Sequence, residues 1–274
     1  MENLVTSALL EDVGHEDITT NSVVDSALRC RVRLSAKQDG ILSGMQPFKT
    51  AFEVMRADIG EWSGLEDGAA FCRGDVIASF TGATRAVLTA ERTAMNFVQH
   101  LSGVATLTRR FVDALEGLDC RICGTRKTTP MLRSLEKAAI VHGGGASHRH
   151  SLFDGVLIKE NHVMAAGGIG EAVRRARRQA HHLMRVEVEV RDLDELGQAL
   201  AAEADVVMLD NMDNETMAEA VRRARARRVV VEASGNASLE RVRGMAATGV
   251  DFVSVGALTH SAPAIDLTLL IENI

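Results

Sequence analysis

The stretch VEVEVRDLDELGQALAAEADVVMLD, residues 186–210, decides the fold class of this chain. Two runs rich in valine stand at its ends, and an amphipathic segment lies between them. Short β-branched runs predict buried strands, the segment between them predicts a helix, and Asp192 with Glu195 resembles a capping box at its start. Parallel strands need a crossover connection of this kind, so the stretch predicts one βα unit of a parallel sheet.

The same alternation extends on both sides of this stretch, and the later runs recur roughly every 20 to 30 residues, as βα units do. Six strands are clear and a seventh is compatible with the pattern, which is fewer than the eight of a closed barrel. We therefore predict an open, six- to seven-stranded parallel α/β barrel. Its strands are expected in RICGT (121–125), GVLIK (155–159), VEVEV (186–190), DVVMLD (205–210), RVVVEAS (228–234) and DFVSVG (251–256).

The first hundred residues carry mixed signals instead of this alternation. Residues 29–42 alternate apolar and polar side chains and predict a strand, and residues 75–82 predict a second one. Residues 84–117 have apolar positions near helical spacing and predict one or two long helices. Gly103 and Gly117 punctuate that region, so we expect the helices to be interrupted or ended there.

Composition and charge limit the class of function. The chain has 274 residues, a net charge of −6 and only 3% aromatic residues, so it has neither the basic field nor the stacking platforms of a nucleic-acid binder. No apolar run approaches the length of a membrane span, and the acidic N-terminal stretch lacks the basic flank of a signal peptide. We expect a cytoplasmic protein without nucleic-acid or membrane partners.

Two sequence features suggest functions that we do not favour. Cys120 and Cys123 form a lone CxxC pair, for which we predict a strand start with buried thiols rather than a redox or metal site. The basic segment EAVRRARRQAHH, residues 171–182, is expected to be a solvated outer helix of the barrel.

Polar residues follow most of the predicted strands directly. In barrels, the carboxyl ends of the strands line the active site, and a charged residue after an apolar run is costly unless it is paired or used. Several such residues at one end of one sheet predict a functional site. They are Arg126, Lys127, Lys159, Glu187, Glu189, Asp210, Ser234, Gly235 and Gly256.

These residues divide into chemical groups. The turns ASGN (233–236) and VGAL (255–258) follow the last two strands and offer backbone N–H groups, as phosphate sites of barrels do. The carboxylates Glu189 and Asp210 can accept sugar hydroxyls, hold Mg²⁺ or stabilise a developing positive charge, although one of them can simply pair with Lys159.

The cations complete the pocket. GTRKTTP (124–130) and the glycine-rich HGGGASHRH (142–150) supply cations beside hydroxyl donors. The histidines of the second segment lack the spacing of a metal cluster, and a histidine beside arginine suits a carboxylate better. Fixed cations in a protein of negative net charge imply a highly anionic substrate, and the whole pattern suggests phosphoribosyl transfer to an acid. This part of the predicted pocket comprises the cations with the hydroxyl donor and the histidine beside them: Thr125, Arg126, Lys127, His148, Arg149 and Lys159.

These motifs resemble quinolinate phosphoribosyltransferase, the decarboxylating nicotinate-nucleotide pyrophosphorylase family, over nearly the whole chain. The specific combination is TRKT, GGGxxHR and IKxNH in this order, with LLEDVGHEDITT, VEVEV, VVMLDNM and VEASGN around it. The resemblance implies an N-terminal α/β sandwich in residues 1–103, with 262–274 packing back on it, and an open barrel in residues 104–261. It also implies a pentosyltransferase of NAD biosynthesis that joins quinolinate to phosphoribosyl pyrophosphate (PRPP) and yields nicotinate mononucleotide, pyrophosphate and CO₂ with Mg²⁺.

The resemblance also implies roles for individual residues. Lys127, Lys159, Glu189 and Asp210 are implied as catalytic, and the two carboxylates are implied to hold Mg²⁺ directly or through water. Quinolinate would be bound by Thr125, Arg126, His148, Arg149 and, from a neighbouring subunit, Arg92. This implies a homodimer with shared active sites, or a hexamer built from it. PRPP and its phosphate would be bound by Lys127, Lys159, Glu189, Asp210, Ser234, Gly235, Asn236, Val255, Gly256 and Ala257.

The chain departs from the family pattern at three positions. Gly124 stands where the family usually has Asp, His142 where it has Cys, and Asn236 where it often has a second Gly; Asn tolerates positive φ, so Asn236 is expected to hold the turn. These departures keep open a substrate-shifted paralogue such as the molybdate-transport-associated proteins, although the IKxNH segment is intact. Two less favoured functions are a Schiff-base aldolase that uses Lys159 and a non-catalytic binding protein.

Overall fold

The computed structural model describes residues 1–274, which divide into two compact units. The first unit comprises residues 1–109, 130–144 and 262–274, and the second comprises residues 110–129 and 145–261. No helix combines the length and the apolar character needed to cross a membrane.

The second unit is built on one parallel sheet of six strands in the order β6-β11-β10-β9-β8-β7. Because β6 and β7 are its two edges, the sheet stays open, and the predicted open α/β barrel is confirmed with six strands. Each strand lies where an apolar run predicted it. Their bounds are β6 (Arg121–Cys123), β7 (Val156–Ile158), β8 (Val186–Val190), β9 (Val206–Asp210), β10 (Val230–Ser234) and β11 (Phe252–Ser254).

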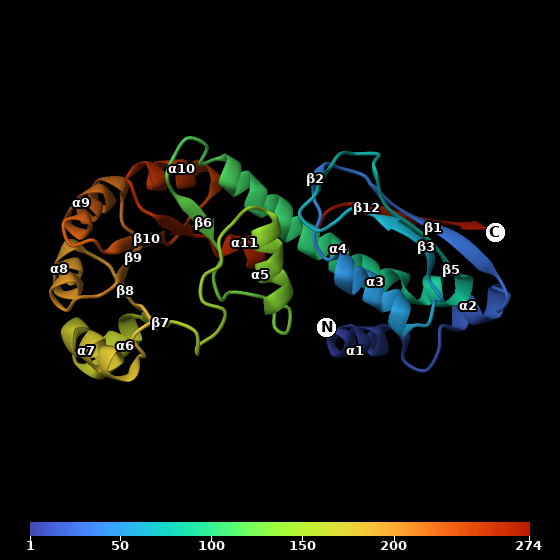
Figure 1. Cartoon of the computed structure of the whole chain (residues 1–274), viewed down its shortest axis with the longest axis horizontal. Coiled ribbons are helices and arrows are strands. Elements are labelled where there is room, and N and C mark those ends of the chain that lie inside the picture. The colour runs from blue at the N-terminus through green and yellow to red at the C-terminus, as the bar shows by residue number, and fades with distance from the viewer. The chain divides into compact units, whose positions relative to one another are not determined.

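Helices connect these strands, and Figure 1 shows α7, α8, α9 and α10 on the outer side of the curved row of strands. These four helices each bury apolar residues, as the alternation of runs requires, whereas α6 buries none. The helices are α6 (Glu160–Ala166), α7 (Ile169–Gln179), α8 (Leu193–Ala201), α9 (Asn214–Arg225), α10 (Leu239–Ala247) and α11 (Ala257–His260).

The predicted start of α8 is partly confirmed. The Asp192 carboxylate accepts hydrogen bonds from the N–H groups of Asp194 and Glu195, as an N-cap should. Glu195, however, accepts from the N–H of Arg191 and not from that of Asp192, so the reciprocal half of the capping box is displaced by one residue.

The basic helix α7 is a solvated outer helix, as predicted. Ala172 and Val173 are buried, whereas Glu171 forms ion pairs with the exposed side chains of Arg174 and Arg175. Charge on this helix is therefore used for local pairing on the surface.

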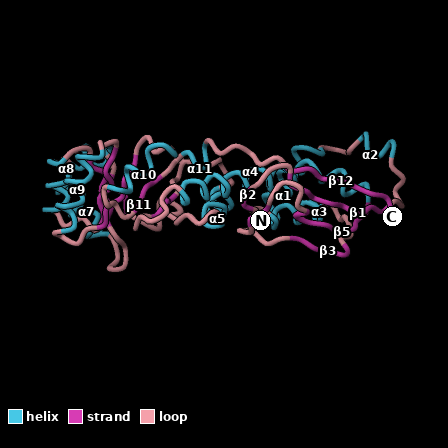
Figure 2. The backbone as a smooth tube through the Cα atoms, turned by 90° about the horizontal axis from the view of Figure 1, so that it is seen from above, coloured by secondary structure: helices cyan, strands magenta, loops and turns pink.

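The first unit contains an antiparallel sheet in the order β12-β1-β5-β3, a two-stranded pair β2-β4, and flanking helices. Figure 2 shows β12, β1, β5 and β3 as neighbouring magenta segments. The elements are α1 (Glu2–Val13), α2 (Ile18–Val23), β1 (Arg29–Ala36), β2 (Gly40–Ile41), α3 (Met45–Val54), β3 (Gly60–Gly64), β4 (Ala70–Phe71), β5 (Val76–Ala83), α4 (Thr84–Asp113), α5 (Arg133–His142) and β12 (Leu267–Asn273).

The core of this unit shows why its residues form these elements. β1 alternates buried and exposed side chains, because it has one face on the core and one outside. Phe52 of α3 lies between Phe48 of the same helix and Phe80 of β5, with ring centroids 5.1 Å from the first and 4.9 Å from the second. The prediction of one strand over residues 29–42 is wrong, because the chain leaves the sheet after Ala36 and continues as β2, which pairs with β4.

The expected interruption at Gly103 is also wrong. α4 runs unbroken from Thr84 to Asp113, and a Cβ at Gly103 would lie 2.1 Å from the carbonyl oxygen of Pro263. Glycine is needed there because another part of the chain approaches the helix closely.

The two units differ from the predicted domain boundaries at α5. Residues 130–144 cluster with the first unit, where Glu136 contacts His100 at 2.8 Å and His142 contacts Ser43 at 2.9 Å. The boundaries implied by the resemblance, 1–103 and 104–261, placed this segment in the barrel. β12 pairs with β1 in the first unit.

Candidate active site

The carboxyl ends of the strands of the second unit surround a cavity of about 940 Å³. It contains nearly all the site residues predicted for the barrel; Val255 is buried beside it and does not line it. The predicted residues that line the cavity are Thr125, Arg126, Lys127, His148, Arg149, Lys159, Glu189, Asp210, Ser234, Gly235, Asn236, Gly256 and Ala257.

Arg126 and Arg149 form the cationic part of this cavity. The Nε atoms of both guanidinium groups are buried and have no hydrogen-bond partner. Burial, with the nearby charge of Arg126, lowers the pKa of Arg149, while Glu187 opposes that shift. Buried donors are normally satisfied, and two like charges repel, so this pair is suited to a ligand with more than one anionic acceptor.

His148 lies behind these arginines. Its Nδ1 accepts a hydrogen bond of 2.8 Å from the backbone N–H of Arg149, and its Nε2 lies 3.2 Å from a carboxylate oxygen of Glu187. Because Nδ1 is an acceptor here, the proton resides on Nε2 and faces Glu187. The imidazole therefore ties the Arg149 backbone to a buried carboxylate, a connection that the sequence did not indicate.

Glu187 and Glu232 make the floor of this region acidic. His148 Nε2 lies 3.6 Å from Glu232, and Ser254 donates a short hydrogen bond to Glu232. Burial, together with the charge of Glu187, raises the pKa of Glu232 to about 7. The sequence predicted Glu187 among the polar residues of the site without a role of its own, and Glu232 was missed. Their interior positions, in runs otherwise apolar, were the available signal.

This His148, Glu187 and Glu232 group has donor atoms close enough to hold a metal ion, all within 4.8 Å of one another. The same atoms already make a hydrogen-bonded chain, in which Cys123 Sγ also contacts Ser254 Oγ at 3.3 Å. These contacts make the group a buried polar network, in which Oε1 of Glu187 is buried without a hydrogen-bond partner.

Lys159 and Glu189 form an ion pair across the cavity. Lys159 follows β7 and Glu189 belongs to β8, the neighbouring strand, so the sheet places them side by side. The Glu189 side chain is 15% exposed, whereas that of Lys159 is 47% exposed, so the lysine is the more solvent-accessible partner. The sequence left open that one of the two carboxylates simply pairs with Lys159. Glu189 does so, and both side chains still line the cavity.

The loop after β6 is braced by hydroxyl groups. The N–H of Lys127 donates to Thr125 Oγ1 at 3.0 Å, and Thr259 Oγ1 donates to the carbonyl of Lys127 at 2.7 Å. The Cδ atom of Lys127 would lie 3.1 Å from a Cβ at Gly256. The loop thus brings Lys127 against the turn after β11.

The other end of the cavity has the features of a phosphate site. Gly235 has φ 92° and Asn236 has φ 49°, which confirms that Asn236 holds the turn after β10. The N-cap residue of α10, Ser238, makes no side-chain capping bond, although the Glu240 carboxylate of the first turn contacts its own N–H and the Ser238 hydroxyl, so this helix start is only partly open to an anion. Sequence reasoning missed Asn211, Ala237, Ser238 and His260, which also line the cavity.

Glu189 and Asp210 could hold a hard metal ion. They end neighbouring strands, β8 and β9, and both line the cavity. Carboxylate oxygens are the ligands that Mg²⁺ prefers, and Mg²⁺ usually binds through one or two of them together with substrate phosphates and water. The donor set therefore fits Mg²⁺.

Arg92 belongs to α4 in the first unit, and its side chain is exposed. Its neighbour Glu91 has a raised pKa because of burial, which the charge of Arg92 partly offsets. Arg92 is thus accessible on the surface of the first unit, and its role toward a second subunit stays a prediction.

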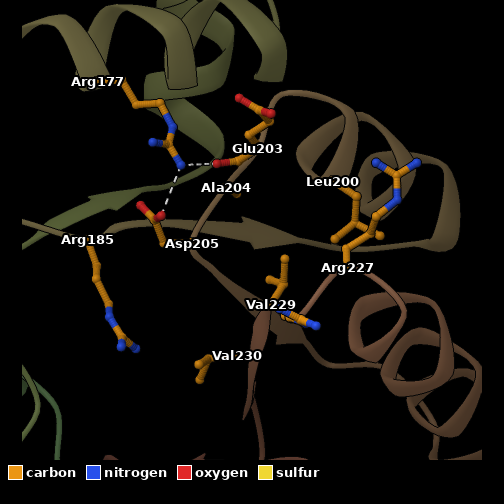
Figure 3. Close-up of a pocket in the computed structure, with 10 residues that line it drawn as sticks. Arg177, Arg185, Leu200, Glu203, Ala204, Asp205, Arg227, Val229 and Val230 are labelled. Atoms are coloured by element: carbon orange, nitrogen blue, oxygen red, sulfur yellow. Dashed lines mark hydrogen bonds and ion pairs between the residues drawn. The ribbon is translucent and has the colours of Figure 1, made fainter.

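A second cavity, of about 480 Å³, lies at the opposite, amino ends of the same strands (Figure 3). It is also rich in arginine. Arg177 donates to the Glu203 carbonyl and, at 2.9 Å, to the Asp205 carboxylate, as the dashed lines of Figure 3 show. This end of a barrel normally serves stability rather than chemistry.

An open parallel barrel with a cavity of fixed cations and carboxylates at its carboxyl ends defines the class of this protein: a barrel enzyme acting on small, highly charged substrates. Two family profiles match the chain. They are described as the C-terminal domain of quinolinate phosphoribosyl transferase, over residues 104–270, and its N-terminal domain, over residues 17–102. The chain belongs to the quinolinate phosphoribosyl transferase family.

Individual relatives agree with this assignment. The nicotinate-nucleotide pyrophosphorylase (carboxylating) of Mycobacterium leprae is 40% identical over 267 residues, which cover 96% of this chain and 94% of the relative. A solved structure of the nicotinate-nucleotide pyrophosphorylase from Francisella tularensis is 40% identical, with a TM-score of 0.93 over 99% of this chain and 95% of that one. NadC from Streptococcus pyogenes is 37% identical, with a TM-score of 0.94 over 100% of this chain and 96% of that one.

Proposed function

We propose that this enzyme transfers the phosphoribosyl group of PRPP to quinolinate, with loss of CO₂, to give nicotinate mononucleotide and pyrophosphate. The observation that carries the proposal is the arrangement of one cavity: two arginine Nε donors without partners near one end, and a turn with positive φ before a partly open helix start at the other. The first end suits a dicarboxylate and the second suits a 5′-phosphate.

The residues between these ends fit the reaction. Departure of pyrophosphate breaks the bond to C1 of the ribose and leaves positive charge there, which Glu189 and Asp210 stabilise. The pyridine nitrogen forms the new C1–N bond with its lone pair. When the bond between the neighbouring ring carbon and its carboxylate breaks, CO₂ departs and the bonding electrons stay on that carbon. The positive charge on the nitrogen stabilises this electron pair, and a proton then replaces the carboxylate.

The chain's own groups act through position and charge. Arg126 and Arg149 orient the two carboxylates, and Lys127 and Lys159 lie beside the reacting groups in the same cavity. Mg²⁺, held by Glu189 and Asp210 directly or through water, supplies positive charge at the pyrophosphate leaving group when it is bound. No covalent nucleophile is required.

Substrate choice tests this proposal. Purified protein is incubated with PRPP, Mg²⁺ and either quinolinate or nicotinate, and the products are identified. We expect nicotinate mononucleotide and CO₂ from quinolinate and little product from nicotinate, because a mono-acid leaves a buried arginine donor unpaired. Comparable turnover of nicotinate, or no turnover of quinolinate, would contradict the proposal. The second outcome would favour a substrate-shifted paralogue.

The assembly is part of the same proposal. We infer a homodimer in which Arg92 enters the partner's cavity, with a hexamer as a larger form. Arg92→Ala and Lys159→Ala are each expected to be inactive, and mixing them should restore up to roughly a quarter of wild-type activity by random pairing. If subunit exchange is demonstrated independently and the mixture stays inactive, Arg92 does not act in a neighbouring subunit.

A further inference from the structure

The ends of β9 and β10 are joined by a chain of two asparagine side chains. Asn211 Nδ2 donates to the Asp210 carboxylate at 3.0 Å, and Asn236 Nδ2 donates to Asn211 Oδ1 at 3.0 Å. Asp210 ends β9, and Asn236 lies in the turn that follows β10. The chain therefore connects the candidate carboxylate of the reaction with the candidate phosphate turn.

The direction of this chain is determined by the carboxylate. An ionised carboxylate only accepts hydrogen bonds, so the atom of Asn211 that faces Asp210 must be the NH₂ group. Its oxygen then faces Asn236 and requires a donor, which the Asn236 amide supplies. Neither amide can be flipped without placing two acceptors or two donors against each other.

The backbone holds both asparagines in place for this contact. Asn211 has φ 55° and Asn236 has φ 49°, both in the left-handed region that Asn tolerates better than most residues. The N–H of Asn211 donates to the Ser234 carbonyl at 3.0 Å, and a Cβ at Gly235 would lie 2.3 Å from Asn211 Oδ1. Arg241 holds the turn from the other side by donating to the Asn236 carbonyl at 3.1 Å.

We infer that Asn211 and Asn236 are positioning residues that act as one brace between Asp210 and the phosphate turn. The inference rests on the proposed function, because it takes the ligand as a ribose 5-phosphate moiety with its hydroxyl groups near Asp210 and its phosphate in the turn. The brace fixes the spacing of these two anchors before the ligand arrives, which lowers the cost of ordering them on binding.

A double-mutant cycle tests the brace with ribose 5-phosphate as the probe in calorimetry. Asn211→Gly and Asn236→Gly remove one amide each and keep a residue that adopts positive φ without strain. Asn236→Gly loses one hydrogen bond of the brace and should weaken ribose 5-phosphate about 5-fold, the equivalent of about 1 kcal/mol. Asn211→Gly loses both hydrogen bonds and should weaken it at least as much. The double variant should be no weaker than Asn211→Gly, because in that variant the Asn236 amide has already lost its partner.

Two further variants sharpen the result. Asn236→Asp keeps the shape but places an acceptor against Asn211 Oδ1 and a negative charge in the turn, so it should weaken the probe by at least about 30-fold. Asn214→Ala removes an asparagine at the start of α9, outside the brace, and should leave the affinity unchanged. Melting temperatures of all variants report folding independently.

The kinetic readout separates the brace from the proposed function. In the brace variants, KM for PRPP should rise several-fold more than KM for quinolinate. Additive effects of the two glycine variants, or equal changes in both KM values, would overturn the brace while wild-type turnover leaves the proposed function standing. A wild-type protein that binds ribose 5-phosphate but does not use quinolinate would instead overturn the proposed function, and the calorimetric cycle would still decide the brace.

Discussion

An arginine-rich cavity lies at each end of the strands of the parallel sheet, and the two cavities differ in whether their arginines are exposed and paired. At the amino ends, Arg177 is exposed and bonded to Asp205 and the Glu203 carbonyl (Figure 3). At the carboxyl ends, Arg126 and Arg149 are partly buried and each keeps a buried Nε without a partner. The number of cations therefore does not distinguish a binding site from a solvated surface.

Desolvation explains the difference. An exposed arginine retains its water, so pairing with a carboxylate contributes little. A buried donor without a partner costs free energy that a ligand can recover, and burial already lowers the pKa of Arg149. Buried arginine donors without a partner lie only at the carboxyl end of the sheet, where Glu189, Asp210 and the candidate phosphate turn also lie.

The largest expected effect comes from Arg149→Ala. Its guanidinium is expected to pair with a substrate carboxylate, and truncating one partner of a buried charge pair costs roughly 2–5 kcal/mol. We expect kcat/KM for quinolinate to fall by roughly 30-fold to several thousand-fold, with KM for PRPP changed far less. Steady-state kinetics with each substrate varied in turn measures both quantities. A variant in which only the KM for PRPP changes would show that Arg149 binds PRPP and not quinolinate.

The substitution Lys159→Ala is expected to have the next largest effect. Removing one preorganised charge typically costs about 2.7–4 kcal/mol, so kcat should fall at least about 100-fold while the circular dichroism spectrum is unchanged. Lys159 also pairs with Glu189, so a purely structural role is the competing explanation. A folded variant with near-normal kcat would establish that structural role.

Much of the fold and of the site could be predicted from the sequence, because both depend on local patterns. Runs such as DVVMLD and RVVVEAS mark the strands by their period and end in polar residues, so parallel pairing alone gathers those residues at one edge. The same reasoning passed over Glu232, because this residue lies within an apolar run and not at its end, and its partners are known only from the structure. Nor could it find Asn211, whose role depends on the turn after another strand.

The failures in the first unit have the same origin. Gly103 looks like a helix breaker in sequence, but its lack of a side chain serves a close approach of Pro263, a residue far away in the chain. Residues 29–36 alternate and residues 41–42 are apolar again, but β2 pairs with β4 and not with the sheet of β1. Long-range contacts override local pattern in both cases.

The next prediction concerns Glu232, one of the buried carboxylates near His148, and the pH dependence of stability. Burial raises the pKa of Glu232 to about 7 from an ordinary value of 4.5, so the folded protein holds this proton more tightly than the unfolded chain. The stabilisation is fully present below pH 4.5 and is lost as the pH rises through 7. Glu232→Gln cannot titrate, so its stability relative to wild type should increase by about 1–3 kcal/mol between pH 5 and pH 8.

Denaturant unfolding of both proteins at several pH values measures this difference. Glu187→Gln provides the matched control, since removing the neighbouring charge should make the wild-type pH dependence weaker without abolishing it. A stability difference that does not change with pH would mean that Glu232 stays ionised, held by His148 and Ser254.

The smallest effect is expected from Arg177→Ala, which is the counterpart of Arg149→Ala at the opposite end of the sheet. The Arg177 side chain is 41% exposed and that of Asp205 is 33% exposed, so their ion pair is worth at most about 1 kcal/mol. Asp205 keeps its hydrogen bond of 2.8 Å from the N–H of Val186, so no buried acceptor is left without a partner. Stability should fall by less than about 1 kcal/mol, and kcat/KM should stay within about 2-fold of wild type. A 10-fold loss of activity with unchanged stability would show that the amino-end cavity influences the reaction, and pairing and exposure would then no longer be sufficient to tell the two ends apart.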